Sequence, residues 1–302
     1  MVSEGIARVG VIGAGAMGAG IAEVCARANT DVLVYERTRE LAVVGRARIL
    51  RSLNRGVSSG QLTERERDQA TWRLRFSTDL GDFADREMVC EAVIEDAAVK
   101  TGVFADLDKV VTDPSAVLAS ATSSIPIMTL GMATQNPSRV IGMHFFNPVP
   151  ALPLVELVST LMTAPHVSDR AEVFAHDVLG KQVIRSADRS GFIVNSLLVP
   201  YLLSAIRMVE SGFASIEDID KGMMAGYAHP VGPLRRCDLV GLDTVKVIAD
   251  KMFEEFREPL YAPPPLLLRM VEAGRLGKKS GRGFYFYGDS YSYGDSVVTQ
   301  SP

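Results

Sequence analysis

The sequence predicts an α/β domain with a mostly parallel sheet, followed by an all-helical domain. A glycine-rich segment lies between two short apolar runs near the N-terminus, and apolar residues recur at helical spacing from Asn195 onward. At 302 residues the chain exceeds what one hydrophobic core comfortably serves. We therefore expect an α/β domain over residues 1–187, a helical domain over 188–287 and a flexible tail over 288–302.

Composition limits the classes of function. Hydrophobic residues make up 47% and charged residues 23%, as in ordinary soluble globular proteins. A net charge of −4 without a basic run argues against nucleic-acid binding, and no stretch approaches the ~20 apolar residues of a membrane span. The spacing of the 3 cysteines and 4 histidines predicts neither a disulfide nor a metal site. The first strand begins by Arg8, which leaves no room for a signal peptide, so we expect a cytoplasmic protein.

A glycine motif, G-x-G-x-x-G, follows the strand predicted over 8–12. Gly13 permits a tight turn, Gly15 lets the backbone approach a pyrophosphate, and Gly18 lets the next helix pack on the strand. A helix over 19–27 and a second strand come next. The motif therefore predicts a Rossmann-type dinucleotide-binding domain.

The cofactor prediction depends on the end of the second strand. Glu36 is placed to bind the adenine-ribose hydroxyls, and its charge would repel the 2′-phosphate of NADP, which favours NAD. Arg37 and Arg39 follow, however, and an arginine there can accept that phosphate, so NADP stays open. The helix start offers free N–H groups and a positive dipole end to the pyrophosphate. The backbone contacts expected there come from Gly13, Gly15, Ala16, Met17 and Gly18.

Two helices, over 38–54 and from Thr63, interrupt the alternation of strands and helices. They form either a helical arm over a ligand or a simple insertion, and their composition does not discriminate. The remaining strands of the first half are predicted over 74–77, 88–94, 116–119 and 183–186.

Polar residues follow two of these strands. The strand over 88–94 ends at Glu95, and Lys100 follows at the head of the next helix. Charges at the carboxyl end of a central strand face the ligand crevice in such folds. The strand over 116–119 leads to Ser123, whose hydroxyl can donate to a substrate oxygen or cap the next helix.

A strand–turn–strand segment ends the first half. Val140 and Ile141 lead to His144, an Asn147-Pro turn follows, and a second short strand brings in Glu156. An imidazole with a carboxylate behind it suits proton transfer near neutral pH. The alternative is a core histidine that caps a strand near a surface glutamate.

The second half is predicted to be helical. The helix from Asn195 ends at Gly212, a capping box opens the next at Ser215, and another spans 238–256. A basic cluster at 278–282 is interpreted as a solvated turn.

Several motifs occur together and in one order: Gly13–Gly18, Glu95–Lys100, Thr122–Ser124, His144–Pro150, Leu154–Glu156, Gly191–Asn195, His229–Pro233, Asp238–Asp243 and Gly281–Tyr285. With these motifs the chain resembles the L-3-hydroxyacyl-CoA dehydrogenases, and most closely their bacterial 3-hydroxybutyryl-CoA members. The likeness runs from about Arg8 to Tyr287, nearly the whole chain.

The resemblance implies an NAD-dependent oxidoreductase that interconverts (3S)-3-hydroxyacyl-CoA and 3-oxoacyl-CoA of short chain length. It implies that His144 is the general base and that Glu156 orients it. Ser123 and Asn195 would bind the reacting oxygen or support the histidine. Along the nicotinamide ribose it implies Glu95 and Lys100. The implied substrate contacts are Ser52, Arg55, Ser123, His144, Asn147 and Asn195.

The chain departs from the family pattern around the substrate. Ala121 replaces the asparagine usually found before Thr-Ser-Ser. On the arm, Ser52 matches a coenzyme-A contact, but the basic residue expected beyond it is Ser59, with Gln61 nearby, so Arg55 is the expected substitute.

These departures keep two alternatives open. One is a related dehydrogenase for a carrier-protein-bound or small polar hydroxyacyl group. The other is a catalytically silent NAD-binding protein, against which the intact Ser123, His144, Glu156 and Asn195 argue. The resemblance also implies a homodimer formed through the helical domain.

Overall fold

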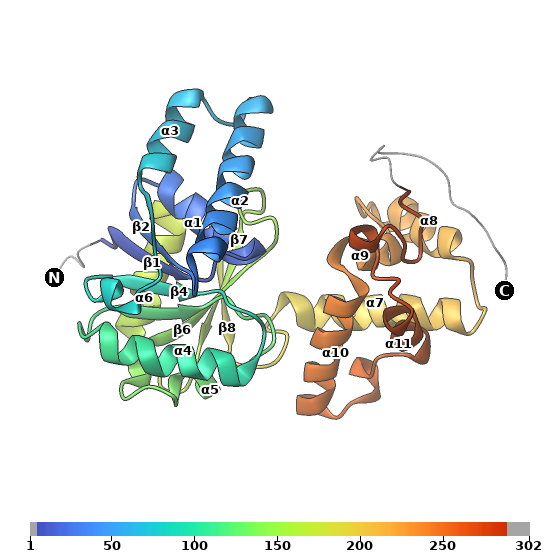
Figure 1. Cartoon of the computed structure of the whole chain (residues 1–302). Helices are drawn as coiled ribbons and strands as arrows, with labels where there is room; N and C mark the ends of the chain where they lie inside the picture. The colour runs from blue at the N-terminus through green and yellow to red at the C-terminus, as the bar shows by residue number, and fades with distance from the viewer. Residues whose placement is uncertain (1–4, 289–302) are drawn as a thin grey trace. The chain divides into compact units, whose positions relative to one another are not determined.

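The structure, a computed structural model, describes residues 5–288 (Figure 1). The chain divides into two compact units between Phe192 and Ile193. The first unit is a sheet with helices on both faces, and the second is helical, which confirms the predicted fold class. Residues 289–302, nearly all of the tail predicted over 288–302, lie outside the described residues.

The first unit is built on one eight-stranded sheet with the order β3-β2-β1-β4-β5-β6-β7-β8. Neighbouring strands are parallel, except that β6 and β7 are antiparallel. The central strands β4, β5 and β6 are buried along their whole length, as near-continuous apolar runs in a covered sheet predict. The strands are Arg8–Ile12 (β1), Asp31–Tyr35 (β2), Leu74–Ser77 (β3), Met88–Glu91 (β4), Val117–Ser120 (β5), Val140–Phe145 (β6), Leu154–Ser159 (β7) and Gln182–Ala187 (β8).

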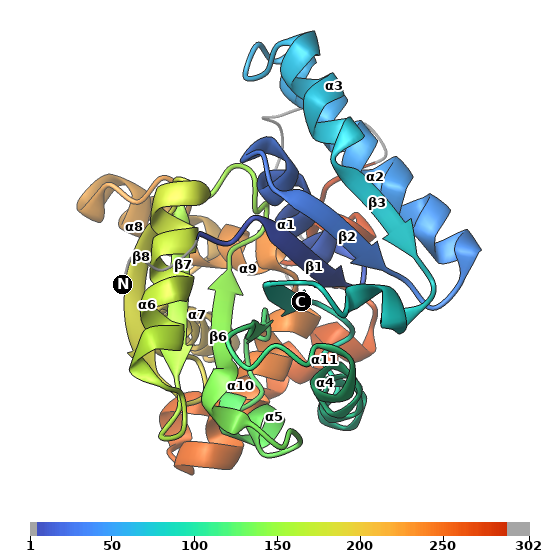
Figure 2. The same ribbon diagram turned by 90° about the vertical axis from the view of Figure 1, so that its left-hand side faces the viewer.

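Helices cover both faces of this sheet (Figures 1 and 2). One core layer packs α1 and α6 against the sheet, and another packs α4 and α5 against its opposite face. Helices α2 and α3 pack against each other and project from the sheet as an arm. The helices are Ala16–Arg27 (α1), Arg39–Ser58 (α2), Glu64–Trp72 (α3), Ala97–Val110 (α4), Ile127–Gly131 (α5) and Pro165–Val173 (α6). Single turns are Leu80–Phe83 (η1), Pro137–Arg139 (η2) and Phe174–Val178 (η3).

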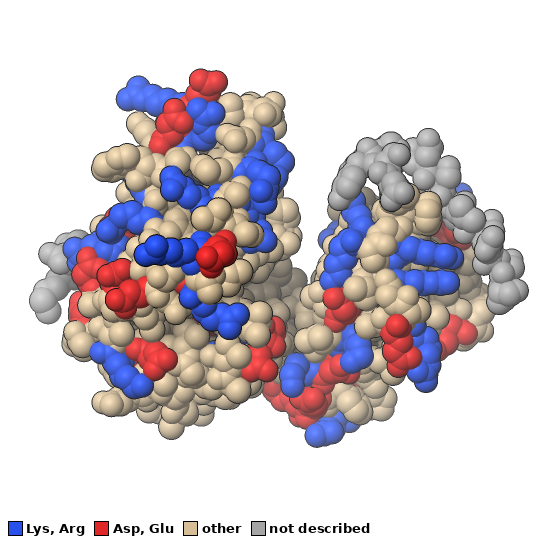
Figure 3. All heavy atoms as spheres, viewed as in Figure 1, with Lys and Arg blue, Asp and Glu red and all other residues tan. Residues whose placement is uncertain are grey.

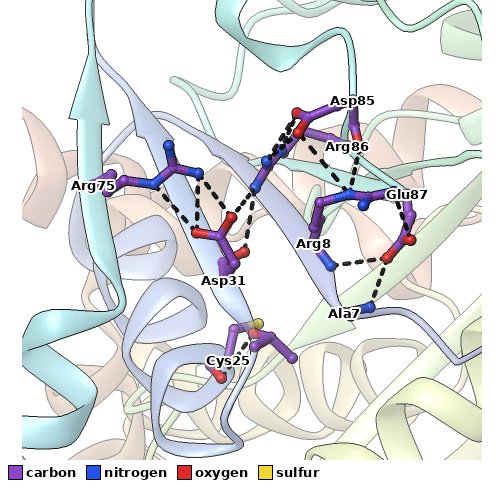
Figure 4. A network of polar contacts seen from close by, with 9 residues as sticks. Ala7, Arg8, Cys25, Asp31, Arg75, Asp85, Arg86 and Glu87 are labelled. Carbon is purple, nitrogen blue, oxygen red and sulfur yellow. Dashed lines mark hydrogen bonds and ion pairs between the residues drawn. The ribbon is translucent and has the colours of Figure 1, made fainter.

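The amino-terminal ends of the strands are fastened by charged side chains (Figure 4). The Arg86 guanidinium is buried and lies 3.1 Å from the Asp31 carboxylate and 2.8 Å from that of Asp85. Arg75 contacts the same Asp31 at 2.7 Å. These charges neutralise one another at the edge opposite to the carboxyl ends of the strands, so the cluster is structural.

The second unit has its own apolar core, formed mainly by α7, α9, α10 and α11. The helix predicted over 238–256 is two helices, because Gly241 between them has a φ of 100°, which a continuous α-helix does not allow. Of the capping box predicted at Ser215, the serine half is confirmed: the Ser215 hydroxyl accepts the N–H of Asp218 at 3.1 Å, at the start of the helix over Ile216–Tyr227. The elements are Val194–Glu210 (α7), Ile216–Tyr227 (α8), Pro233–Val240 (α9), Leu242–Phe256 (α10), Pro259–Tyr261 (η4), Pro265–Glu272 (α11) and Lys278–Ser280 (η5).

Candidate active site

The loop between β1 and α1 depends on its three glycines. Gly13 has a φ of +91°, and a Cβ there would lie 3.0 Å from the carbonyl oxygen of Ala92. A Cβ on Gly18 would lie 1.8 Å from the carbonyl oxygen of Gly13, so no side chain fits where α1 crosses the loop. A Cβ on Gly15 would have no described heavy atom within 4 Å. This open cradle fits the pyrophosphate of a dinucleotide.

The start of α1 suits an anion. Its N-cap residue, Gly15, makes no side-chain capping bond, and the first turn contains no acidic residue. The first N–H groups of a helix have no partner within the helix, and the helix dipole adds positive charge there. The residues at this start are those predicted to contact the cofactor: Ala16, Met17 and Gly18.

Glu36 lies half-buried directly after β2. Its Oε1 accepts the backbone N–H of Ala14 at 2.5 Å, which leaves its second oxygen for a ribose hydroxyl. Arg37 and Arg39 are exposed. The carboxylate accepts a hydrogen bond from the loop backbone, and these residues fit NAD.

A buried ion pair links β4 to α4. Glu91 is 0% exposed, and its Oε1 lies 2.7 Å from the Lys100 ammonium. Its Oε2 accepts the Ser120 hydroxyl at 2.6 Å. Lys100 is 1% exposed and also lies 3.3 Å from Glu95. Lys100, predicted as a cofactor contact, is thus enclosed between two carboxylates.

Glu95 organises the hydroxyl segment after β5. Its Oε1 accepts the Thr122 hydroxyl at 2.5 Å, the Ser124 hydroxyl at 2.9 Å and the N–H of Ser123 at 3.1 Å. Burial raises the pKa of Glu95, but the Lys100 ammonium and these donors outweigh it and hold the pKa below its ordinary value. Glu95 is therefore a stable anion.

The hydroxyl of Ser123 has no hydrogen-bond partner among the described residues, although its backbone is held by Glu95. The alternative role, capping the next helix, falls to another residue. The Asp188 carboxylate accepts the N–H groups of Ile127 at 2.8 Å and Met128 at 2.7 Å, at the start of α5. The Ser123 hydroxyl is left available for a ligand.

The structure brings the predicted imidazole and carboxylate together. The antiparallel register of β6 and β7 pairs His144 directly with Glu156. Their side chains meet with the His144 Nδ1 2.6 Å from the Glu156 Oε2. Glu156 is 0% exposed and His144 5% exposed, so the contact excludes water. The alternative of a core histidine beside a surface glutamate is wrong, because the glutamate is buried.

Two aromatic rings flank the histidine. The His144 ring centroid lies 4.6 Å from that of Phe146 and 5.4 Å from that of Phe192. These rings restrict the imidazole orientation, and the Glu156 contact occupies Nδ1. The other ring nitrogen, Nε2, is not used in the Glu156 contact.

The other residues predicted for the site lie outside the two strands that hold His144 and Glu156. Asn147 is exposed two residues after β6, and Asn195 is buried in the first turn of α7, in the second unit. Ser52 and Arg55 lie on α2, where both interact with the buried Glu23 carboxylate. Burial raises the pKa of Glu23 above its ordinary value, although Ser52 and Arg55 oppose that shift.

Two residues of this site are absent from the sequence prediction. Glu91 carries a signal, because an acid inside the apolar run of a central strand needs a buried partner. The other is Arg48 on α2, which donates to the carbonyl oxygen of Ala14 at 2.5 Å. Nothing in the sequence distinguishes Arg48, because that helix is rich in arginine.

Across residues 5–288, no group of three or more His, Cys, Asp or Glu side chains could hold a metal ion. None of the described helices is both long and apolar enough to span a membrane.

Comparison with known proteins assigns the chain to a family. The model of the NAD-binding domain of 3-hydroxyacyl-CoA dehydrogenase matches residues 8–189, and that of the C-terminal domain matches residues 191–287. A 3-hydroxybutyryl-CoA dehydrogenase of Mycobacterium tuberculosis is 67% identical over 95% of this chain and 100% of its own length. A probable 3-hydroxybutyryl-CoA dehydrogenase of Deinococcus radiodurans is 42% identical over 93% of this chain and 100% of its own.

Solved structures agree. The crystal structure of M. tuberculosis FadB2 matches with a TM-score of 0.94 at 67% identity, covering 94% of this chain and 100% of that one. The (S)-3-hydroxybutyryl-CoA dehydrogenase PaaH1 of Ralstonia eutropha matches with a TM-score of 0.89 at 38% identity, with the same coverage. The chain therefore belongs to the 3-hydroxyacyl-CoA dehydrogenase family and is an NAD-dependent dehydrogenase.

Proposed function

We propose that the chain interconverts (3S)-3-hydroxybutyryl-CoA and acetoacetyl-CoA, with NAD as the hydride carrier. The observation that carries the proposal is the buried contact of 2.6 Å between His144 and Glu156. The family relationship supplies the reaction class, and the printed names of the relatives point to a four-carbon acyl group.

The acid–base chemistry follows from the imidazole. Glu156 holds Nδ1, so in oxidation Nε2 of His144 takes the proton of the substrate hydroxyl. Glu156 then stabilises the imidazolium, and in reduction the same nitrogen returns the proton to the carbonyl oxygen. NAD, when bound, accepts or returns the hydride at the neighbouring carbon.

The remaining polar groups position the reactants. The free hydroxyl of Ser123 is assigned to the reacting oxygen, together with Asn195 and Asn147, which are assigned by resemblance alone. Glu95, held anionic by Lys100, is assigned to the nicotinamide ribose. The adenine half is assigned to Glu36 and to the backbone of Gly13, Gly15, Ala16, Met17 and Gly18.

The coenzyme-A part is assigned to the arm. Arginine side chains line the flank of α2, as Figure 3 shows. Ser52 and Arg55 are its proposed contacts, and both approach Glu23. At Ser59, where the resemblance leads one to expect a basic residue, the hydroxyl donates to the Gly56 carbonyl at 3.1 Å. Gln61 is exposed.

A homodimer through the second unit is part of the proposal, and exposed apolar side chains support it: Leu197, Phe213, Met224, Tyr227 and Leu239. Light scattering should give twice the mass of one chain, and the mass of a single chain would reject the dimer. A cytoplasmic location is also proposed, since the three cysteines are free and buried thiols.

The test is a turnover assay with NADH and NADPH over a panel of 3-oxoacyl thioesters. Acetoacetyl-CoA with NADH should give the highest kcat/KM. A higher value with a carrier-protein thioester would show that the acyl carrier is a carrier protein and not coenzyme A. A higher value with a small polar acyl group would show that the substrate is not the four-carbon acyl thioester. NADH binding without turnover of any thioester would indicate a catalytically silent protein.

A further inference from the structure

One residue of the glycine loop, Ala14, is held from both sides. Its N–H donates to Glu36 Oε1 at 2.5 Å, and its carbonyl oxygen accepts from Arg48 Nη1 at 2.5 Å. Glu36 follows β2, whereas Arg48 lies on the arm helix α2. The peptide groups on either side of Ala14 are therefore each anchored by a charged side chain.

The arm helix approaches this residue very closely. A Cβ on Gly45 would lie 2.3 Å from the Cβ of Ala14, so α2 reaches the loop only because Gly45 has no side chain. Arg48 is three residues further and lies on the same face of the helix. The close packing at Gly45 thus delivers the guanidinium of Arg48 to the Ala14 carbonyl.

The Arg48 contact has a geometric consequence for the neighbouring N–H. The carbonyl of Ala14 and the N–H of Gly15 belong to one planar trans peptide, so they point in opposite directions. Fixing the oxygen toward α2 directs the Gly15 N–H away from α2. That N–H has no acceptor within the described residues, and the space around a Cβ on Gly15 is open. It is oriented for a phosphate oxygen before the ligand arrives.

Arg48 is also not part of an ion pair among the described residues. Its bond to Ala14 is the only hydrogen bond or ion pair that it makes within residues 5–288, and the side chain is half-buried. A guanidinium has five N–H donors, so four remain. Partial burial weakens screening by solvent, and the positive potential at the start of α1 increases. An anion is favoured there more than the helix dipole alone would favour it.

We infer that Arg48 is a positioning residue for the dinucleotide: it fixes the Ala14–Gly15 peptide so that the Gly15 N–H meets the pyrophosphate. Arg48 acts through the loop backbone, and Gly45 makes that action possible. The inference rests on the dinucleotide site of the proposed function and is independent of the acyl thioester.

The test compares Arg48→Met, which keeps the length of the side chain and removes the donor, with Arg48→Lys, which keeps a charged donor. Arg46→Met is the matched control, because Arg46 is exposed on the same helix and makes no hydrogen bond or ion pair with a described residue. NADH affinity is measured by fluorescence titration without thioester. ADP-ribose, which has the pyrophosphate but no nicotinamide, is measured as a competitor.

Arg48→Met should weaken NADH and ADP-ribose by the same factor, about 10-fold, as expected for loss of one charge-assisted hydrogen bond. Arg48→Lys should recover most of this affinity, and Arg46→Met should bind as the wild type does. In turnover, Arg48→Met should raise KM for NADH by the same factor and change kcat by less than about 2-fold.

Three results would overturn the inference. They are unchanged NADH affinity in Arg48→Met, a loss confined to NADH and absent with ADP-ribose, or equal losses in Arg48→Met and Arg48→Lys. The last would mark Arg48 as a packing element of α2. Because binding is measured without thioester, failure of the proposed substrate leaves these outcomes unaffected.

Discussion

Buried acids are held in different ways in the two units. In the first, each faces an ionisable side chain: Glu91 lies 2.7 Å from the Lys100 ammonium, and Glu156 lies 2.6 Å from the His144 imidazole. Both carboxylates are 0% exposed. Their partners offset the cost of burying the charge.

In the second unit the buried acids face mainly the backbone. Asp220 accepts the N–H groups of 234–235, in the first turn of α9, at 2.8 and 2.9 Å, and the Tyr285 hydroxyl at 2.8 Å. Asp238 accepts the N–H groups of 284–285 at 2.9 Å each. Within residues 5–288, neither forms an ion pair.

This difference distinguishes a carboxylate that can take part in a reaction from one that only anchors the chain. An imidazole can gain and lose a proton near neutral pH, so the carboxylate beside it can stabilise one state of a reaction. A backbone N–H gives up no proton in that range, so a carboxylate bound to it only fixes a segment of chain. Changes in the first unit should therefore alter turnover, and changes in the second should alter stability.

The largest effect is expected for His144→Ala. Loss of the acid–base group should lower kcat by at least about 100-fold, while NADH affinity stays near that of the wild type. His176→Ala is the control, because His176 is an exposed histidine of the same unit. A kcat within about 3-fold of the wild type would remove His144 from the mechanism.

Asp220→Ala should affect the stability of the fold and not the turnover. Two N–H groups and one hydroxyl lose their acceptor, so the free energy of unfolding should fall by about 2 kcal/mol. Denaturant unfolding followed by circular dichroism measures this change. Glu254→Ala removes an exposed acid from the same unit and should cost less than about 0.5 kcal/mol. Equal stability of the two variants would contradict the anchoring role.

A smaller effect is expected from pH. Burial, against the opposing backbone N–H groups and with help from the nearby Asp220 charge, raises the pKa of Asp238 from 3.8 to about 6. The folded protein therefore binds a proton more readily than the unfolded chain. The stability that this proton contributes is complete below the unfolded value of 3.8 and is lost as pH rises through about 6.

As the pH is lowered from about 6 to 5, protonation of Asp238 should increase the free energy of unfolding by about 1 kcal/mol. Asp238→Asn should remove that gain, whatever its effect on stability at neutral pH. Identical pH slopes for Asp238→Asn and the wild type would show that Asp238 titrates normally.

Local patterns predicted much of this molecule. The glycine motif predicted the first strand, turn and helix, and the β-formers before His144 predicted a strand that pairs it with Glu156. Helical spacing predicted α7, but it missed the break at Gly241, because a single positive φ leaves apolar periodicity intact.

Contacts between distant segments were not predictable in the same way. The partner of Glu91 is nine positions away and on another element, and the short distance between Gly45 and Ala14 depends on how α2 packs on the loop. Neither the Glu91–Lys100 pair nor the Gly45–Ala14 contact is marked by a periodic pattern in the sequence. Spatial neighbours of this kind are decided by packing.

The most direct test of the His144–Glu156 pair is the pH–rate profile of Glu156→Gln for the reduction of acetoacetyl-CoA. Glutamine keeps the shape and can accept the Nδ1 hydrogen, but it no longer stabilises the imidazolium. We expect a lower kcat and a pH–rate profile that is displaced from that of the wild type, with unchanged NADH affinity. Superimposable profiles would contradict the account, because Glu156 would then have no influence on the proton that His144 transfers.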